Sequence, residues 1–251
     1  MNSTLVKGLG LLEILANSDR PLGVTELASQ LDISKSNVHR LLQTLVQLQY
    51  VKQAENTGYF VSVRLWELSA RVIAGFDLPR VAAPFMQQLL DETQESVHLS
   101  VLDGDEVVYI HKLDSPQPVR AYTQIGGRAP AYCVATGKAL LAFEAESRLA
   151  SLSGRLKAYT PQTLIGPEAF LGEMQRIRQT GYAVNRGEWR EGVHGLAAPI
   201  YSTDGGVVAA MGISGPAERL KASRIKQLTG YVVDRAAGLT GALSTNPSPR
   251  D

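Results

Sequence analysis

The chain has 251 residues, of which 44% are hydrophobic and 20% are charged, and its formal net charge is +1. This length accommodates one large domain or two smaller ones, and the composition is that of a soluble globular protein with a buried core. No apolar run approaches the roughly 18 to 20 residues of a membrane span, and the N-terminus lacks the pattern of a secretion signal. We therefore expect a cytoplasmic location and no membrane partner. The single cysteine, Cys133, excludes an internal disulfide and suits a reducing compartment.

Charge is unevenly distributed over the first 64 residues. Residues 1–32 contain two basic and four acidic side chains, a local sum of minus two. Residues 33–64 contain four basic side chains and one acidic side chain, a local sum of plus three. The near-neutral net charge of the whole chain does not indicate a nucleic-acid partner. The basic segment 33–64 is therefore the part of the N-terminal region that suits one.

Helical periodicity predicts three helices at the N-terminal end. The first covers 6–16 and ends at the segment NSDRPLG, which contains residues typical of turns. The second covers 24–31, with apolar residues spaced as on one face of a helix. The third follows Ser34, a strong N-cap residue, and repeats this spacing as far as Leu45. The second and third helices, joined by a tight turn, are typical of a helix-turn-helix.

The third helix has an apolar face and a polar face. At 100° per residue, its apolar side chains occupy an arc of about 100°, and polar side chains lie opposite. The polar side chains are concentrated at the N-terminal end, where free backbone N–H groups and the positive end of the helix dipole suit a phosphate group. We predict DNA contacts for Ser34, Lys35, Ser36, Asn37, His39 and Arg40. For any single one of them, a solvated charge or cap on an ordinary helical domain is the alternative.

The roles of these six residues follow from their chemistry. Lys35 and Arg40 are expected to meet phosphates or guanine, and the two serines to meet phosphates. Asn37 and His39 are expected to meet base edges or the DNA backbone.

A β-hairpin is predicted next, with strands 50–53 and 59–63 around the turn AENTG. It forms a wing beside the helices, and Lys52 near its base is added to the predicted DNA contacts. Residues 1–64 are therefore interpreted as a winged helix-turn-helix domain. A helix over 65–78, apolar on a broad face, is predicted to link this domain to the rest of the chain and is available to pair with a second subunit.

Strands and helices are predicted in the remainder of the chain, residues 79–243. The predicted strands are 96–104, 105–115, 119–127, 182–186, 193–202 and 206–215. The predicted helices are 83–96, 133–145, 167–181 and 217–243. Several antiparallel strands with helices at their ends and on one face indicate an α+β domain. Residues 244–251 form a polar, proline-containing tail that we expect to be disordered.

Residue patterns give little support for catalysis or metal binding. The segment YCVATGKA lacks the first glycine of a phosphate-binding loop and the hydroxyl that follows its lysine. Cys133 with His111 or His194 offers a thiol nucleophile and a base, but a lone cysteine at the start of an apolar helix is more often a buried small side chain. The four histidines show no metal-ligand spacing. We predict no catalytic residue, no metal and no cofactor.

Two long motifs follow the winged helix and the linker helix: GGRAPAYCVATGKALLA and GYAVNRGEWREGVHGLAAPIYSTDGGVVAAMGISGP. In this order they closely resemble the IclR family of bacterial transcriptional regulators, over essentially the whole chain. The resemblance implies that residues 79–243 form a GAF-like effector-binding domain. It also implies a homodimer or homotetramer on a pseudo-palindromic operator, and control of a catabolic operon by a small metabolite.

A binding pocket for this metabolite is predicted around two flexible segments, 125–130 and 135–138, whose backbone N–H groups suit a carboxylate. The resemblance implies that the acid group lies at the positions of Ala135 and Thr136. The predicted effector-binding residues, most of them taken from the resemblance, are Gly127, Ala135, Thr136, Asn185, Arg186, Gly195 and Ser214. Ordinary packing or turn geometry is the alternative for each of them.

Two of these positions depart from the family pattern. Gly195 stands where many members have a cysteine, which opens volume, and Asn185-Arg186 replaces an acidic residue with an amide or a cation. A larger or more anionic effector, such as a sugar acid or an aromatic acid, is the resulting hypothesis.

Two other functions stay open on the sequence. In the first, the C-terminal domain is an enzyme that turns over its small molecule, although no nucleophile, base and orienting group stand at supportive spacing. In the second, the chain is an adaptor that binds a protein partner and protects no operator.

Overall fold

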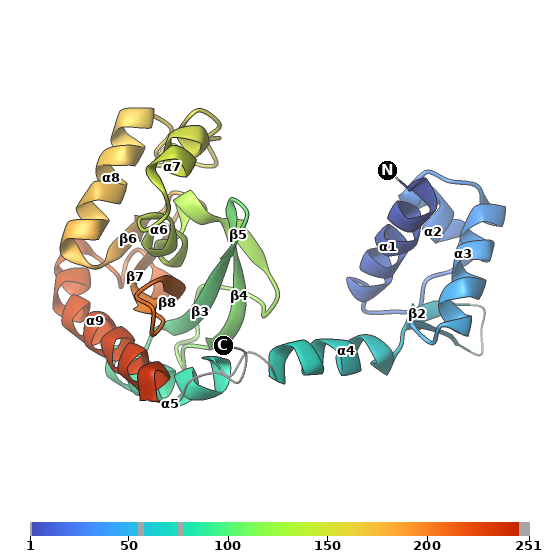
Figure 1. The fold of residues 1–251 in the computed structure, drawn as a ribbon, viewed down its shortest axis with the longest axis horizontal. Helices are drawn as coiled ribbons and strands as arrows, with labels where there is room; N and C mark the ends of the chain where they lie inside the picture. The colour runs from blue at the N-terminus through green and yellow to red at the C-terminus, as the bar shows by residue number, and fades with distance from the viewer. Residues whose placement is uncertain (1, 55–57, 75–77, 246–251) are drawn as a thin grey trace. The chain divides into compact units, whose positions relative to one another are not determined.

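The computed structural model describes residues 2–54, 58–74 and 78–245, and the chain divides into two compact units, Met1–Phe76 and Asp77–Asp251. Part of the predicted hairpin turn (55–57), part of the predicted linker (75–77) and most of the predicted tail (246–251) lie outside the described residues. Figure 1 draws both units as ribbons coloured from the N-terminus to the C-terminus.

The first unit begins with three helices, α1 (Ser3–Ala16), α2 (Val24–Leu31) and α3 (Lys35–Gln47). Side-chain caps mark the start of two of them: the Asn2 side chain accepts hydrogen bonds from two backbone N–H groups of α1, and Ser34 Oγ accepts one from Asn37 N at 3.4 Å. Asp32 adopts a left-handed conformation, φ 51°, which ends α2 and forms the tight turn into α3. The predicted helix-turn-helix is confirmed.

Apolar side chains from all three helices form the core of this unit. Leu11, Leu27, Val38 and Leu42 are fully buried, which is the face that the periodicity of α2 and α3 predicts. The strands β1 (Val51–Gln53) and β2 (Tyr59–Val61) are antiparallel, and an isolated bridge between Leu22 and Tyr59 ties them to the segment before α2. The helix α4 (Val63–Ala74) then begins two residues earlier than predicted.

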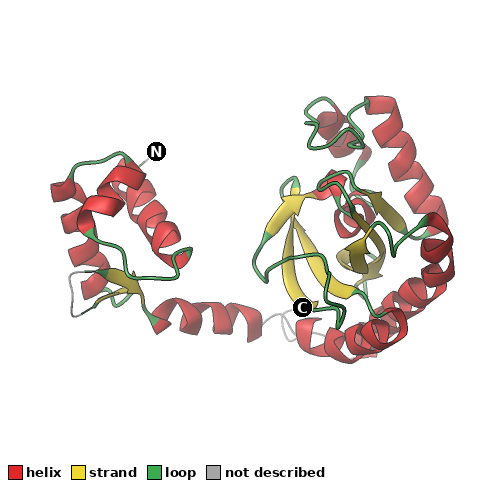
Figure 2. Ribbon diagram, turned by 180° about the vertical axis from the view of Figure 1, so that it is seen from behind, coloured by secondary structure: helices red, strands yellow, loops and turns green. Residues whose placement is uncertain are grey.

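A single six-stranded antiparallel sheet lies at the centre of the second unit. Its strand order is β5-β4-β3-β8-β7-β6. The strands are β3 (Ser96–Asp103), β4 (Glu106–Leu113), β5 (Arg128–Pro130), β6 (Ala183–Arg186), β7 (Val193–Tyr201) and β8 (Val207–Pro216). Figure 2 shows this sheet in yellow with helices in red on both sides.

Helices cover both faces of this sheet, whereas the sequence predicted helices at its ends and on one face. The helices α5 (Leu78–Thr93) and α9 (Ala222–Thr245) pack on one face in a core that includes Leu99 and Met211. On the other face lie the 3-10 turn η1 (Ala131–Cys133) and the helices α6 (Ala135–Leu141), α7 (Glu146–Ser153) and α8 (Pro167–Thr180), in a core that includes Val107 and Ala210. The α+β class is confirmed.

The predicted strand 119–127 is wrong. Its alternation of apolar residues resembles a strand, but Val119, Tyr122 and Ile125 are all exposed, and the segment is irregular. Only Gly126 and Gly127 hydrogen-bond to Tyr109 at the edge of the sheet, and the pairing strand is β5, which follows them.

Several helix boundaries also differ from the predicted ones. Pro79 lies in the first turn of α5, where a helix needs no N–H group from it, so the helix begins at Leu78, before both Pro79 and Pro84. The predicted helix 133–145 is the shorter α6, which follows η1, α9 begins at Ala222, and α7 was not predicted. Within the described part of the chain, no helix has the length and apolarity that crossing a membrane requires.

Candidate functional site

The exposed face of α3 carries the predicted DNA contacts. Ser34, Lys35, Ser36, His39 and Arg40 are exposed and Asn37 is half-buried, while Val38 and Leu42 on the opposite face are buried. Hydrogen bonds between near neighbours in the sequence connect these side chains: Ser34 Oγ lies 3.0 Å from Ser36 Oγ, and an Arg40 nitrogen lies 3.4 Å from Asn37 Oδ1.

Among the described residues of this unit, three exposed cations are free for an anionic partner. Lys35 and Arg40 on α3 and the exposed Lys52 on β1 form no salt bridge among the residues that the structure describes. Arg20 and Arg64 differ, since they pair with Glu26 at 2.6 Å and with Glu67 at 3.2 Å. Lys7 on α1 is half-buried and also forms no salt bridge among the described residues, so it is the exposed unpaired cations that the sequence assigned to DNA.

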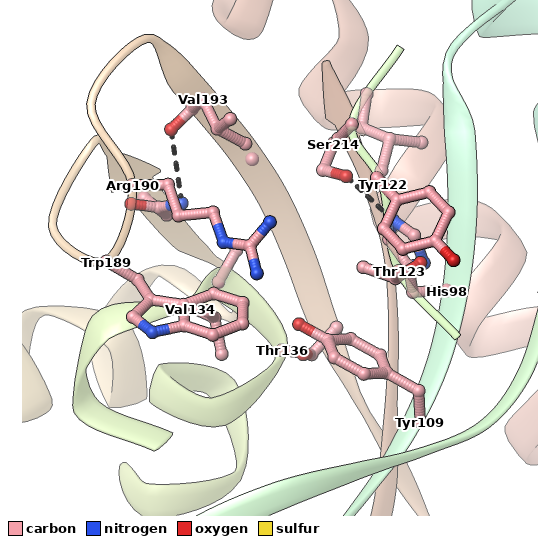
Figure 3. A pocket seen from close by; sticks show the side chains of 15 residues that line it. His98, Tyr109, Tyr122, Thr123, Val134, Thr136, Trp189, Arg190, Val193 and Ser214 are labelled. Atoms are coloured by element: carbon pink, nitrogen blue, oxygen red, sulfur yellow. Dashed lines mark hydrogen bonds between the residues drawn. The ribbon is translucent and has the colours of Figure 1, made fainter. Parts of the chain in front are cut away.

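A cavity in the second unit lies between α6, the sheet and the loop after β6 (Figure 3). Its empty volume, which includes space open to solvent, is about 540 Å³. Strands β3, β4, β7 and β8 form its floor, and the start of α6 and the irregular segment before β5 form its walls. It is lined by His98, Tyr109, Ala121, Tyr122, Thr123, Val134, Ala135, Thr136, Asn185, Trp189, Arg190, Val193, Gly195, Ile213 and Ser214.

One end of the cavity is polar and neutral. His98 Nε2 lies 2.7 Å from Ser214 Oγ on the neighbouring strand, and His98 Nδ1 lies 3.3 Å from Thr123 Oγ1. Burial, helped by the charge of Lys112, lowers the pKa of His98 from 6.5 to about 4. The imidazole is therefore neutral at physiological pH and exchanges hydrogen bonds with hydroxyl groups.

The other end of the cavity is formed by Trp189 and Arg190. The Arg190 guanidinium lies 4.4 Å from the centroid of the Trp189 ring, within the range of a cation–π contact. Figure 3 shows this guanidinium directed into the cavity beside the indole. Tyr109 lines the same cavity, and burial raises the pKa of its phenol to about 12, so its hydroxyl stays protonated.

Asn185 and Glu188 hold the loop that carries these two residues. Asn185 Oδ1 accepts hydrogen bonds from Gly187 N at 3.0 Å and Glu188 N at 3.1 Å. Glu188 Oε2 accepts one from Arg186 N at 2.7 Å, and its other oxygen binds Lys138 Nζ at 2.8 Å. The loop is thus fixed to α6 before any ligand arrives.

Five of the seven predicted effector-binding residues line this cavity: Ala135, Thr136, Asn185, Gly195 and Ser214. The other two do not. The Gly127 carbonyl accepts a hydrogen bond from Tyr109 N at the edge of the sheet, and Arg186 is exposed on β6. A Cβ atom at Gly195 would lie 3.0 Å from Ile213 O and 3.4 Å from Ala135 Cβ, so the glycine keeps this part of the cavity open.

Sequence reasoning missed the residues that give the cavity its chemistry. His98 and Tyr109 lie on predicted strands, and an alternating pattern does not reveal which strand faces surround a cavity. Arg190 lies between Gly187 and Gly192, both of which have positive φ. Their sequence signal indicates a loop but does not indicate which of its arginines points inward.

A thiol nucleophile and a metal site find no support in the structure. Cys133 is fully buried, and burial raises the pKa of its thiol to about 12, so the reactive thiolate does not form at neutral pH. Among the described residues, no group of three or more His, Cys, Asp or Glu side chains is arranged to hold a metal ion.

Comparison with known families decides the relationship. Residues 4–55 match the IclR helix-turn-helix domain, and residues 70–240 match the family described as bacterial transcriptional regulator IclR C-terminal. The chain belongs to the IclR family. The resemblance expected from the sequence is therefore confirmed. The first matched segment contains the exposed face of α3, and the second contains the cavity.

IclR relatives match this chain over nearly its whole length. The HTH-type transcriptional regulator KdgR of Escherichia coli K12 is 35% identical, over 98% of this chain and 95% of that protein. The crystal structure of Thermotoga maritima IclR is 27% identical with a TM-score of 0.81, covering 97% of this chain and 100% of that one. This IclR-family chain is a DNA-binding transcriptional regulator.

An IclR homologue from Microbacterium hydrocarbonoxydans, solved in complex with 4-hydroxybenzoate, has the same fold. The TM-score is 0.86 and the identity 24%, over 97% of this chain and 100% of that one.

Proposed function

We propose that this regulator binds a pseudo-palindromic operator as a homodimer or homotetramer, and that a small organic acid bound in the second unit changes its operator affinity. The observation that carries the proposal is a cavity whose lining contains a cation and no carboxylate, on a chain that also has a helix-turn-helix with free cations. The genes it controls would belong to a catabolic operon, and the protein would act in the cytoplasm, where the operator is.

The DNA contacts of the proposal are the exposed residues of α3 and the wing: Ser34, Lys35, Ser36, Asn37, His39, Arg40 and Lys52. Lys35, Arg40 and Lys52 supply charge to phosphates or guanine, and the hydroxyl and amide groups position α3 on the backbone or read base edges. A symmetric dimer matches half-sites near one helical turn apart, about 34 Å, or a multiple of it.

The effector contacts of the proposal are the lining residues that sequence reasoning also selected: Ala135, Thr136, Asn185, Gly195 and Ser214. Support for an acid comes from the charge of the cavity, because its lining contains Arg190 and no carboxylate. Support for a ligand of this class also comes from the 4-hydroxybenzoate bound by the homologue of the same fold. A sugar acid or an aromatic acid fits these features.

Binding of the acid would favour one arrangement of the subunits. The helix α4 would transmit this change to the spacing of the two recognition helices. A coupling free energy of roughly 1 to 3 kcal/mol corresponds to a change in operator affinity of about 5- to 150-fold.

The experiment that tests the proposal is footprinting and fluorescence anisotropy on DNA upstream of the protein's own gene, with and without a panel of organic acids. We expect a protected, pseudo-palindromic site whose dissociation constant changes at least about 5-fold with one of the acids. An unprotected fragment, or an operator affinity that no acid alters, would contradict the proposal. Consumption of the acid during the assay would instead indicate an enzyme.

A further inference from the structure

The cavity contains one charged side chain. Of the fifteen residues that line it, Arg190 alone carries a charge at neutral pH, because burial keeps His98 uncharged. Other arginines of this unit are paired with carboxylates, for example Arg128 with Asp103 at 2.7 Å and Arg219 with Glu95 at 2.7 Å. Arg190 has no carboxylate within ion-pair distance among the described residues.

The Arg190 side chain is also held in place. An exposed arginine without a partner usually extends into water, but this one lies against the Trp189 ring and is directed into the cavity (Figure 3). The loop beneath it is fixed from the opposite side, where Thr160 Oγ1 donates to Gly187 O at 2.7 Å and Thr163 Oγ1 donates to Glu188 O at 2.6 Å. A cation that is oriented before binding loses little entropy when an anion arrives.

The end of the cavity at His98 favours a different chemical group from the end at Arg190. His98, Ser214 and Thr123 form a chain of hydrogen bonds with no net charge. Neutral imidazole and hydroxyl groups pair well with a hydroxyl group, whereas a second carboxylate there would be desolvated without a counter-ion.

We propose that Arg190 binds the acid group of the effector, and that the effector carries one acid group together with a hydroxyl group that reaches His98 and Ser214. The inference rests on the proposed function, and it adds the binding residue and the polarity of the ligand. It assigns the acid group to Arg190 rather than to the backbone at Ala135 and Thr136. The hydroxyl of Tyr109, which has no hydrogen-bond partner among the described residues, is available to the same acid group.

A paired panel of ligands tests this proposal. Hydroxylated aliphatic acids of three to seven carbons and hydroxybenzoates are each compared with their neutral amide, using thermal stabilisation of the full chain as the screen. The best acid is then measured by isothermal titration calorimetry against wild type, Arg190→Gln and Arg186→Gln. Arg186→Gln removes the same charge from an exposed side chain on the same segment that does not line the cavity.

We expect the acids to bind wild type better than their amides, and Arg190→Gln to weaken the best acid about 10- to 100-fold. Arg186→Gln should change this affinity less than 3-fold, and removing the hydroxyl group from the ligand should weaken binding to wild type. The inference is overturned if no acid binds better than its amide, or if both variants bind the acid equally. Operator binding without any ligand is measured in parallel. If the chain binds no operator, the proposed function is wrong, whereas the inference about Arg190 is still decided by the ligand measurements.

Discussion

Lys138 Nζ lies 2.8 Å from Glu188 Oε1, and both side chains are almost completely buried. Glu173 Oε1 is a second partner of Lys138 at 3.2 Å, and Glu173 is also paired with Arg176. Burial acts to raise the pKa of the Glu173 carboxyl, but the hydrogen bond from Arg176 and the charges of Arg176 and Lys138 outweigh it and lower this pKa. The result is a charge-balanced group of four side chains that connects α6, α8 and the loop of Trp189 and Arg190.

Replacing Glu188 by Gln should destabilise the second unit by about 3 kcal/mol, because it leaves excess positive charge at a buried site. The substitution also weakens the acceptor of the Arg186 N–H group, so the loop over the cavity should loosen. The measurement is urea unfolding of the second unit, followed by the fluorescence of Trp189 in chains where Trp66 is replaced by Phe.

The control is Glu191→Gln, which removes the same charge from an exposed position three residues further along. Its free energy of unfolding should stay within about 0.5 kcal/mol of wild type. Equal losses of unfolding free energy in the two variants would mean that the buried ion pair makes no specific contribution to stability.

The helix-turn-helix could be predicted from the sequence because its determinants are local. Ser34 caps α3 through its own side chain, and Val38 and Leu42 bury the face that their spacing indicates. The charges of Lys35 and Arg40 are exposed on the opposite face. Nothing from a distant part of the chain was needed to find this surface.

The cavity could be predicted only in part because its determinants are not local. The polar end joins His98 on β3 to Ser214, which is 116 positions away in the sequence. At the other end, Arg186 and Arg190 are the same residue type four positions apart. The chain turns between them at Gly187, with φ 86°, and only Arg190 lines the cavity. The segment 119–127 has the alternation of a strand, but the sequence does not reveal that it lacks a neighbouring strand to pair with.

The stability of the second unit should fall below about pH 6.5 because of His98. The pKa of His98 is lowered to about 4 in the folded chain, so the unfolded chain takes up a proton at a higher pH than the folded chain does. Unfolding becomes more favourable as the pH falls through this window, by about 1.4 kcal/mol per pH unit and roughly 3 kcal/mol in all.

Urea unfolding at several pH values checks this effect. His98→Gln should show a flatter dependence between pH 6.5 and 4.5, whereas His39→Gln, an exposed histidine on α3, should keep the wild-type slope. Parallel curves for wild type and His98→Gln would contradict the assignment.

Gly137→Ala should destabilise the second unit by about 1 to 3 kcal/mol. A Cβ atom at Gly137 would overlap the backbone of Ala131. Ala131 belongs to η1 and cannot move without shifting the start of α6. The matched control is Gly172→Ala in α8, where a Cβ atom meets nothing within 4 Å. That substitution should stabilise the helix by about 0.5 to 1 kcal/mol, since alanine is the better helix former. Opposite shifts of the melting temperature are expected, and shifts of the same sign would refute the packing argument.

Arg40→Ala should weaken operator binding by about 1 kcal/mol or more, because the guanidinium on the exposed face of α3 has no carboxylate partner in the described part of the chain and is free for phosphate or guanine. The slope of affinity against salt concentration should fall if the contact is to phosphate, and specificity should relax if it is to a base. Arg20→Ala is the matched control in the same unit, since Arg20 is already paired with Glu26. Because α3 lies in the first unit, thermal stabilisation by the effector should be the same in wild type and Arg40→Ala. Loss of both operator binding and this stabilisation would indicate a folding defect, and unchanged operator binding would remove Arg40 from the DNA surface.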